Sequence, residues 1–284
     1  MRNRLPILLV AMILLAGCGT APGPHPSATP SFNPSPTPSP TSRPTAVFIP
    51  TATSTPKPLT LLFYGDSVLK VGDVSHEGEV GFSIVDDLRQ KLDPADTVIV
   101  QNHGGRSAQW GFENLQKNVL DLHPDLVTLW WGVNDLGGCP GIFDPTTDRL
   151  VQYKLTAYVD QHIKYMRAQI DALLAAKVPV IVITSIPVDG TFPWSHMTSD
   201  NQLVWELDRR CDFNLGLGQL AEAQRKMVTD YSASGKPVSL VDAWQIYHDH
   251  AGTDKMYMDI VHPASQGAQL IAEGWLKVFQ SIER

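Results

Sequence analysis

From residue 59 to the C-terminus, short apolar runs alternate with longer amphipathic segments. The apolar runs hold few polar residues, and such runs predict strands that are buried on both faces rather than half exposed. Five strands are expected, at 59–64, 97–100, 125–131, 178–184 and 238–242. The amphipathic segments predict helices at about 81–92, 110–122, 153–176, 219–231 and 265–279. This alternation favours an α/β fold in which helices cover both faces of a five-stranded parallel sheet, a three-layer α/β/α sandwich.

The first 18 residues have the pattern of an export signal. Arg2 and Arg4 precede an apolar run of about eleven residues, 5–15, whereas a helix that spans a bilayer needs roughly 20. The run closes with Leu-Ala-Gly-Cys, which resembles the bacterial lipobox, and the resemblance implies that Cys18 is acylated and becomes the new N-terminus. The alternative is an ordinary signal peptide that ends near a cysteine. Acylation by more than one chain gives stable anchoring, so we expect an extracytoplasmic protein that is tethered to the cell membrane by lipid alone.

The segment 19–58 has the composition of an unfolded linker. It contains 12 prolines among 40 residues, interleaved with Ser and Thr, and no Asp or Glu. Such a chain cannot bury enough apolar surface to offset its ordering entropy, so we expect it to stay extended. At about 3.1 Å per residue, its contour length approaches roughly 120 Å. The remaining residues, 59–284, suit one α/β domain with a full-sized core.

The charge of residues 59–284 is strongly acidic. The chain has 22 basic and 29 acidic side chains, and four of the basic ones precede residue 59, which leaves 18 against 29 and a formal charge of −11. This charge argues against nucleic acid as a partner and against a basic patch that adheres to membranes. Besides Cys18 there are two cysteines, Cys139 and Cys211. In an exported protein such a pair suggests a disulfide, and two buried free thiols are the alternative.

Polar residues gather in four segments that adjoin the predicted strands. Gly-Asp-Ser at 65–67 follows the first strand, Asn-His-Gly-Gly-Arg-Ser at 102–107 follows the second, and Gly-Val-Asn-Asp at 132–135 follows the third. Asp-Ile-Val-His-Pro at 259–263 comes after the fifth strand and just before the last helix. Because sites in parallel sheets form at the carboxyl ends of the strands, we expect these four segments to meet at one edge.

Together these segments contain the groups that acyl transfer requires. The hydroxyl of Ser67 is a poor nucleophile alone, and His262 can accept its proton. Asp259 can hold the imidazole in the productive tautomer; the alternative is a Ser–His dyad in which Asp259 only accepts loop hydrogen bonds. The backbone N–H groups of Ser67 and Gly105 and the side-chain amide of Asn134 can donate to the oxyanion of the tetrahedral intermediate. We expect no metal and no cofactor for this chemistry.

The four segments resemble the sequence blocks of the SGNH (GDSL) hydrolase family, and the resemblance covers the whole domain from residue 59. It implies a flavodoxin-like sheet with strand order 2-1-3-4-5, and it implies the triad and oxyanion roles given above. Because the second segment is compact, Gly104 is an alternative to Gly105 as the backbone donor. Asp66 and Asp135 are interpreted as structural residues that hold their loops through backbone N–H groups.

We therefore expect a membrane-tethered serine esterase that hydrolyses O-acyl esters through an acyl-enzyme. Gly-Arg-Ser-Ala at 105–108 resembles the version found in family members that act on acetylated plant polysaccharides, which implies a short acyl group such as acetyl on carbohydrate. Deacylation of lipids or lysophospholipids is one alternative, and a non-catalytic surface-binding module on the same fold is another. The expected partner is a small-molecule or polysaccharide ester, and the domain is expected to be monomeric. His248 and His250 are interpreted as part of a surface loop, because their spacing does not match a helical pair of metal ligands.

Overall fold

The computed structural model describes residues 57–69, 83–136, 143–144, 149–150, 152–189, 213–251 and 256–282. Cys18, Cys139 and Cys211 lie outside these ranges, as does nearly all of 19–58. The lipid anchor, the linker and the disulfide therefore stay predictions. Within the described ranges, no helix is both long enough and apolar enough to cross a membrane.

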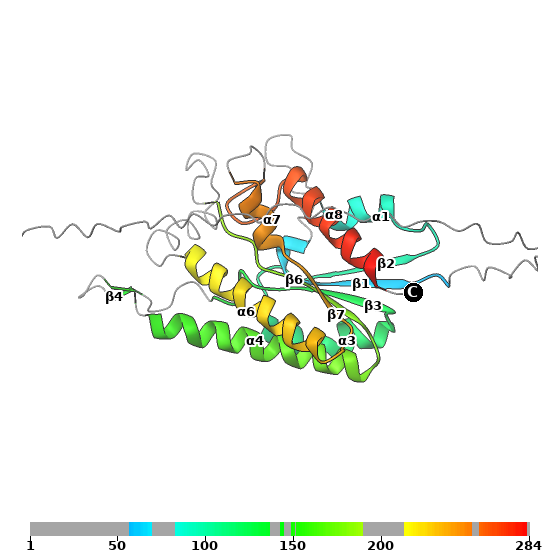
Figure 1. The fold of residues 1–284 in the computed structure, drawn as a ribbon, viewed down its shortest axis with the longest axis horizontal. Coiled ribbons are helices and arrows are strands. Elements are labelled where there is room, and N and C mark those ends of the chain that lie inside the picture. Colours follow the sequence, from blue (N-terminus) through cyan, green and yellow to red (C-terminus); the bar gives the residue numbers. More distant parts are fainter. Residues whose placement is uncertain are drawn as a thin grey trace, which may run out of the picture. The chain divides into compact units, whose positions relative to one another are not determined.

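Five parallel strands form the central sheet (Figure 1). They are β1 (Thr60–Gly65), β2 (Thr97–Asn102), β3 (Leu126–Trp130), β6 (Val180–Ile183) and β7 (Val238–Val241). Their order across the sheet is β2-β1-β3-β6-β7, which confirms the predicted order 2-1-3-4-5. The register places Gly65 beside both Asn102 and Trp130, so β1, β2 and β3 end level with one another at the same edge.

Helices cover both faces of this sheet and complete the predicted three-layer sandwich. They are α1 (Ile84–Lys91), α2 (Ala108–Glu113), α3 (Leu115–Asn118), α4 (Gln152–Ala175), α6 (Phe213–Ala233), α7 (Ala243–Asp249) and α8 (Ser265–Ser281). Figure 1 shows α1, α7 and α8 on one face of the sheet and α3, α4 and α6 on the other. The smaller elements are the 3-10 turns η1 (Ser67–Leu69) and η2 (Leu120–Leu122) and an antiparallel pair, β4 (Phe143–Asp144) with β5 (Arg149–Leu150).

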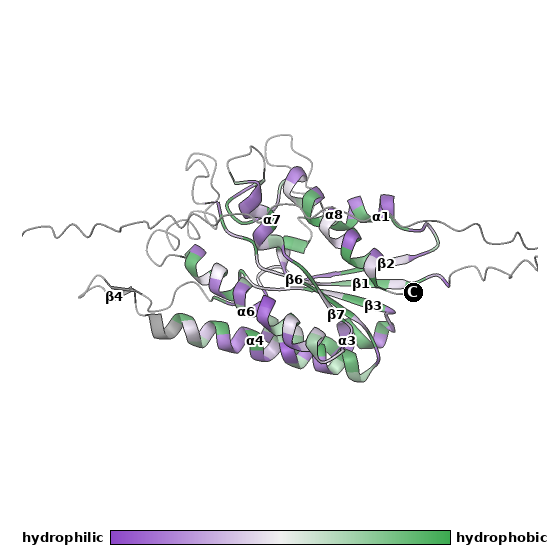
Figure 2. Cartoon of the chain, in the orientation of Figure 1, coloured by the Kyte–Doolittle hydropathy of each residue, from purple (hydrophilic) through white to green (hydrophobic). Residues whose placement is uncertain are grey.

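The strands are apolar on both faces because each face contacts its own core. In β1, Leu61 and Phe63 pack with residues of α1, α7 and α8. Leu62 and Tyr64 pack instead with residues of α2, α4 and α6, because successive side chains of a strand point to opposite faces. Figure 2 shows hydrophobic and hydrophilic residues alternating around the helices, as expected where one side of each helix is buried.

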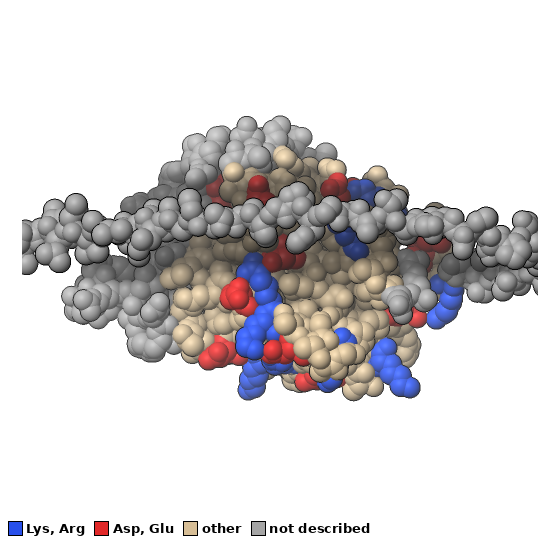
Figure 3. All heavy atoms as spheres, viewed as in Figure 1, with Lys and Arg blue, Asp and Glu red and all other residues tan. Residues whose placement is uncertain are grey.

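Charged side chains of both signs are interspersed on the face shown in Figure 3. Between α4 and α6, Nη2 of Arg167 lies 2.7 Å from Asp230, which also binds Nζ of Lys226 at 3.0 Å. Exposed ion pairs of this kind each contribute about 0–1 kcal/mol to stability. The two apolar cores, rather than these pairs, therefore supply most of the stability of the fold.

The sequence predicted one helix over 110–122, and this prediction was wrong, because the structure has α2, α3 and η2 in its place. Asn114 lies between α2 and α3 with φ −111° and ψ 7°, outside the helical region. Its side-chain amide donates to the carbonyl oxygen of Trp110 at 2.9 Å. That oxygen also accepts from the backbone N–H of Asn114 at 3.1 Å, and the next carbonyl oxygen, that of Gly111, accepts from the hydroxyl of Tyr64 at 2.9 Å.

Two other helices differ from the prediction. α6 begins at Phe213 rather than at about 219, and α7 occupies a segment where a loop containing His248 and His250 was expected. α7 begins where it does because the side chain of Asp242 accepts a hydrogen bond from the backbone N–H of Gln245, which is an N-cap.

Candidate active site

β1 carries Ser67 to the edge of the sheet where the strands end. Gly65 is the last residue of β1, and a Cβ on it would lie 2.3 Å from the carbonyl oxygen of Trp130, so no larger residue fits there. The N–H of Asp66 donates to that same oxygen at 3.2 Å. Ser67 then begins η1 and is half-buried, between the buried Asp66 and Val68. The predicted nucleophile therefore lies on a tight turn that is held by β3.

The segment after β2 lies against Ser67. The N–H of His103 donates to the carbonyl oxygen of Gly65 at 2.9 Å, which fixes the start of the loop. A Cβ on Gly104 would lie 3.6 Å from Cβ of Ser67, whereas Gly105 has φ +70°, a conformation that favours glycine. Within the described part of the chain, the N–H groups of Ser67, Gly104 and Gly105 donate to no other residue. All three are therefore available to bind an oxyanion.

Asn134, in the segment after β3, is oriented by Asp66. Its Nδ2 donates to Oδ2 of Asp66 at 3.2 Å, and Oδ1 of Asp66 accepts from the N–H of Val68 at 3.1 Å. An ionised carboxylate only accepts hydrogen bonds, so this contact determines which end of the amide is the nitrogen and leaves its second N–H for another acceptor. The sequence predicted the contact of Asp66 with the backbone but not its contact with Asn134.

Asp66 is a buried carboxyl group with a raised pKa. Burial raises its pKa from 3.8 to about 7, and the nearby charge of Asp135 adds to the rise. The hydrogen bond from Val68, the charge of His262 and the hydrogen bond from Asn134 each counteract part of this effect. The electrostatic effect of His262 on this pKa also indicates that the fourth segment lies near the first and the third.

Asp259 orients the ring of His262. Oδ2 of Asp259 lies 2.7 Å from Nδ1 of His262, and Oδ1 accepts from the backbone N–H groups of His262 and Val261 at 2.7 and 2.8 Å. Burial would raise the pKa of Asp259, but these hydrogen bonds and the charge of His262 hold its pKa below the usual value. The ionised carboxylate keeps the ring proton on Nδ1, so Nε2 presents a lone pair that can accept a proton.

A small cavity lies among the residues next to these groups. Its volume is about 240 Å³ with open solvent included. Its lining includes three valines that adjoin the predicted site residues. Val68 follows Ser67, Val133 precedes Asn134, and Val261 precedes His262. No hydrogen bond joins Ser67 and His262 within the described residues, and contacts between catalytic groups are often long before substrate binds. The structure thus places all four predicted segments around one site.

Comparison with protein families matches residues 61–275 to the GDSL-like lipases and acylhydrolases. A search of curated proteins finds no match. Among solved structures, a catalytic mutant of Axe2, an acetylxylan esterase from Geobacillus stearothermophilus, is 19% identical, with 79% of this chain and 95% of that chain covered and a TM-score of 0.54. A GDSL-like lipase from Bacteroides thetaiotaomicron is 16% identical, with 79% and 89% covered and a TM-score of 0.52.

Structural likeness at these identities shows the fold alone. The family match is stronger, because it spans most of the chain and includes Ser67, Asn134, Asp259 and His262. The chain is therefore a serine ester hydrolase and belongs to the GDSL-like lipase/acylhydrolase family.

Proposed function

We propose that this protein is an extracytoplasmic esterase, tethered by a lipid on Cys18, that removes short acyl groups such as acetyl from carbohydrate. Ser67 attacks the acyl carbon while Nε2 of His262 takes the hydroxyl proton. His262 then gives this proton to the departing alcohol, and the acyl group stays on Ser67. A water molecule, deprotonated by His262, attacks the acyl-enzyme, releases the acid and restores the serine.

The carbonyl oxygen becomes negatively charged in both tetrahedral intermediates. We assign its stabilisation to the N–H groups of Ser67 and Gly105 and to Nδ2 of Asn134, with Gly104 as the alternative to Gly105. In support, the three backbone N–H groups have no acceptor within the described part of the chain, and the contact with Asp66 holds the amide of Asn134 in one orientation. Fixed donors of this kind act when charge develops, so they favour the transition state over the ground state.

The size of the cavity beside these groups carries the short-acyl part of the proposal. Its 240 Å³ includes open solvent, so the enclosed space is smaller than this figure, and its lining is mostly apolar. Besides the three valines already named, Ile186 and Val188 narrow it. Such a space suits a two-carbon acyl group better than a long chain.

The solved structures support the same substrate class by analogy. Axe2 is described as an acetylxylan esterase and as an acetyl-xylooligosaccharide esterase. Its catalytic mutants replace a serine, a histidine and an aspartate, and the last two lie three positions apart, which is the separation of Asp259 and His262.

Chain-length profiling tests this proposal. The p-nitrophenyl esters of acetate, butyrate and octanoate should give values of kcat/KM that fall at least about tenfold from acetate to octanoate, since a pocket rejects groups it cannot hold. Acetylated xylan should release acetate, and Ser67→Ala should release none above background. Faster cleavage of octanoate or of a lysophospholipid would favour lipid deacylation, and the short-acyl proposal would be wrong. An inert protein whose Ser67 does not react with a fluorophosphonate would contradict it as well.

A matched pair of variants tests the role of the cavity. Val188→Ala enlarges the cavity and should raise the ratio of butyrate to acetate cleavage. Val182→Ala removes the same atoms from the core on the other face of β6, so it should lower stability and leave that ratio unchanged. If the ratio of butyrate to acetate cleavage were the same in Val188→Ala as in Val182→Ala, the cavity would not hold the acyl group.

The tether needs a separate test. Metabolic labelling with an alkynyl fatty acid should mark the wild-type protein and recover it with membranes. Cys18→Ser should lose the label and leave the membrane fraction. A label that persists in the variant, or an unlabelled wild-type protein, would contradict the predicted anchor.

A further inference from the structure

We propose that Asp135, His162 and Gln224 form a buried polar relay that positions Asn134 for catalysis; this inference rests on the oxyanion role proposed above for Asn134. The three residues come from the segment after β3, from α4 and from α6. They act through Asn134 rather than on the substrate, so they are positioning residues.

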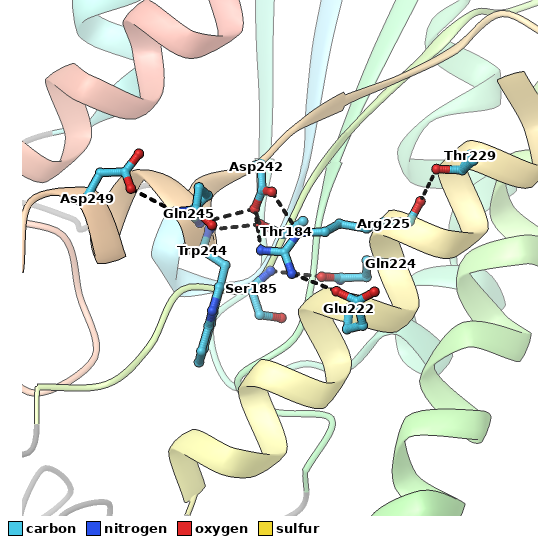
Figure 4. Close-up of polar contacts among 10 residues, drawn as sticks. All are labelled: Thr184, Ser185, Glu222, Gln224, Arg225, Thr229, Asp242, Trp244, Gln245 and Asp249. Carbon is cyan, nitrogen blue, oxygen red and sulfur yellow. Dashed lines mark hydrogen bonds and ion pairs between the residues drawn. The ribbon is translucent and has the colours of Figure 1, made fainter. Parts of the chain in front are cut away.

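Gln224 is fully buried, and two backbone groups determine its orientation. Its Oε1 accepts from the N–H of Ser185 at 2.9 Å, and its Nε2 donates to the carbonyl oxygen of Trp131 at 3.2 Å. Turning the amide over would set oxygen against oxygen and N–H against N–H. Figure 4 shows Gln224 reaching from α6 to Ser185 at the end of β6. The second N–H of Gln224 is therefore left for Nε2 of His162, which lies 2.9 Å away.

This donor fixes the tautomer of His162, whose side chain is also fully buried. Because Nε2 accepts from Gln224, the proton of the neutral imidazole resides on Nδ1. Nδ1 lies 3.1 Å from Oδ1 of Asp135, at an angle outside that of a hydrogen bond. The N–H side of the ring thus faces a carboxylate that is only 5% exposed.

Asp135 connects the two loops that carry the predicted oxyanion donors. Its carboxylate accepts from the N–H of Ala108 at 3.0 and 3.2 Å, at the start of α2 and close after Gly105. Its own N–H donates to the carbonyl oxygen of Gly132 at 2.9 Å, which closes the turn around Asn134. A displacement of the Asp135 carboxylate would therefore disturb both loops together.

Stability alone does not account for these polar groups. Gln224 satisfies two buried backbone groups, but an apolar side chain of similar volume at 162 would fill the same space without desolvating an imidazole. The relay instead supplies direction, because backbone groups just after β3 and β6 fix Gln224, Gln224 fixes the ring of His162, and the N–H side of that ring faces the carboxylate of Asp135 beside Asn134. Oxyanion donors need such support, since a displacement of about 1 Å can cost 10²-fold in rate.

Two replacements of His162 separate its two contacts. In His162→Asn, Nδ2 takes the place of Nδ1 and can still donate to Asp135. In His162→Gln, Oε1 takes the place of Nε2 and can still accept from Gln224, but the donor to Asp135 is lost. With p-nitrophenyl acetate we expect His162→Gln to lower kcat about tenfold to a hundredfold with KM within about twofold, and His162→Asn to stay within about fivefold of wild type.

The second readout is a double-mutant cycle. Asn134→Ala alone should lower kcat about 10²-fold. If His162 acts through Asn134, adding His162→Gln to Asn134→Ala should lower kcat less than about threefold further, since residues that act as a unit are not additive. A full additional loss of tenfold or more would show that His162 acts independently of Asn134, and the relay would be wrong.

A control variant distinguishes positioning from plain destabilisation. Thr128→Val removes a buried hydroxyl from β3, which accepts from Nε1 of Trp275 at 2.8 Å, and it should lower stability while kcat stays within about twofold. If His162→Gln and Thr128→Val, matched for loss of stability by urea unfolding, also lower kcat equally, the relay is refuted. If neither His162 variant folds, Gln224→Met carries the same test. A normal kcat in Asn134→Ala would instead refute the oxyanion assignment of the proposed function.

Discussion

The replacement Asp66→Asn distinguishes two effects of the buried carboxylate: it lowers the stability of the folded protein, and it orients the amide of Asn134. Asparagine keeps the shape of the side chain and one oxygen for the N–H of Val68, but it sets an NH₂ group against Nδ2 of Asn134, 3.2 Å away in the wild type. The amide of Asn134 then loses the partner that fixes its orientation. At pH 8 we expect kcat to fall about tenfold, less than the 10²- to 10³-fold that follows loss of an oxyanion donor altogether.

The stability of the variant should change in the opposite direction. The pKa of Asp66 is about 7 in the folded protein against 3.8 for the unperturbed group, so the folded state binds a proton between these values and the unfolded state does not. Stability from this group is therefore present below about pH 4 and is lost as the pH rises to about 7. At 1.36 kcal/mol per pKa unit, the ionised carboxylate costs the folded state about 4 kcal/mol at pH 8. The mismatched amide of the variant costs about 1–3 kcal/mol at every pH, so Asp66→Asn should be the more stable protein at pH 8.

Urea unfolding of both proteins at pH 5 and pH 8 tests this reasoning. Relative to the wild type, the free energy of unfolding of Asp66→Asn should rise by about 3 kcal/mol between these two pH values, because most of the titration of Asp66 lies between them. Comparing the two proteins cancels the contributions of groups that titrate alike in both. If the free energy of unfolding of the two proteins changed with pH in the same way, the raised pKa of Asp66 would be refuted. An unchanged kcat would refute its role in orienting Asn134.

Three further predictions concern the catalytic groups. Ser67→Ala should lower kcat at least about 10³-fold while the free energy of unfolding stays near that of wild type, and more than a tenth of the activity remaining would exclude Ser67 as the nucleophile. Asn134→Ala should lower kcat about 10²-fold with little change in KM; a change confined to KM would make Asn134 a ground-state binding residue. Asp259→Asn, which no longer holds the tautomer of His262, should lower kcat about 10²- to 10⁴-fold at pH 8, and an unchanged kcat would show that His262 does not depend on Asp259.

The sheet could be predicted from the sequence because its strands are apolar on both faces. Residues Leu61 to Tyr64 alternate between two cores, so no polar position interrupts the run, and the same holds in β6; the only polar residue of β3 is Thr128, whose buried hydroxyl accepts from Trp275. The helix predicted over 110–122 was wrong because apolar periodicity does not reveal the polar contacts at its interruption. The side-chain amide of Asn114 donates to the carbonyl oxygen of Trp110, and the carbonyl oxygen of Gly111 accepts from the hydroxyl of Tyr64 in β1.

The candidate site could be predicted only as far as short motifs describe it. Ser67, Asn134, Asp259 and His262 lie in segments whose spacing and order are visible in the sequence, and the topology brings these segments to one edge. His162 shows the limit. It lies in the middle of a long amphipathic helix, where a single histidine carries no signal, and its partners come from the segment after β3 and from α6. Contacts that join residues far apart in sequence follow from packing, which no local pattern encodes.

The raised pKa of Asp66 also affects the electrostatics of the proposed reaction. The charge of Asp135 raises the pKa of Asp66, and both residues lie beside Asn134, where an oxyanion would form. Two like charges there would oppose the developing negative charge, and the opposition is strong in a buried site of low dielectric. Below about pH 7 Asp66 holds a proton, which removes one opposing charge, and its oxygens can still accept from Nδ2 of Asn134. Above that pH the carboxylate lowers stability and repels the oxyanion, and the tenfold loss expected for Asp66→Asn means that its orientation of Asn134 outweighs this repulsion. The burial of Asp66 therefore favours catalysis near neutral pH, where its own negative charge is already partly suppressed.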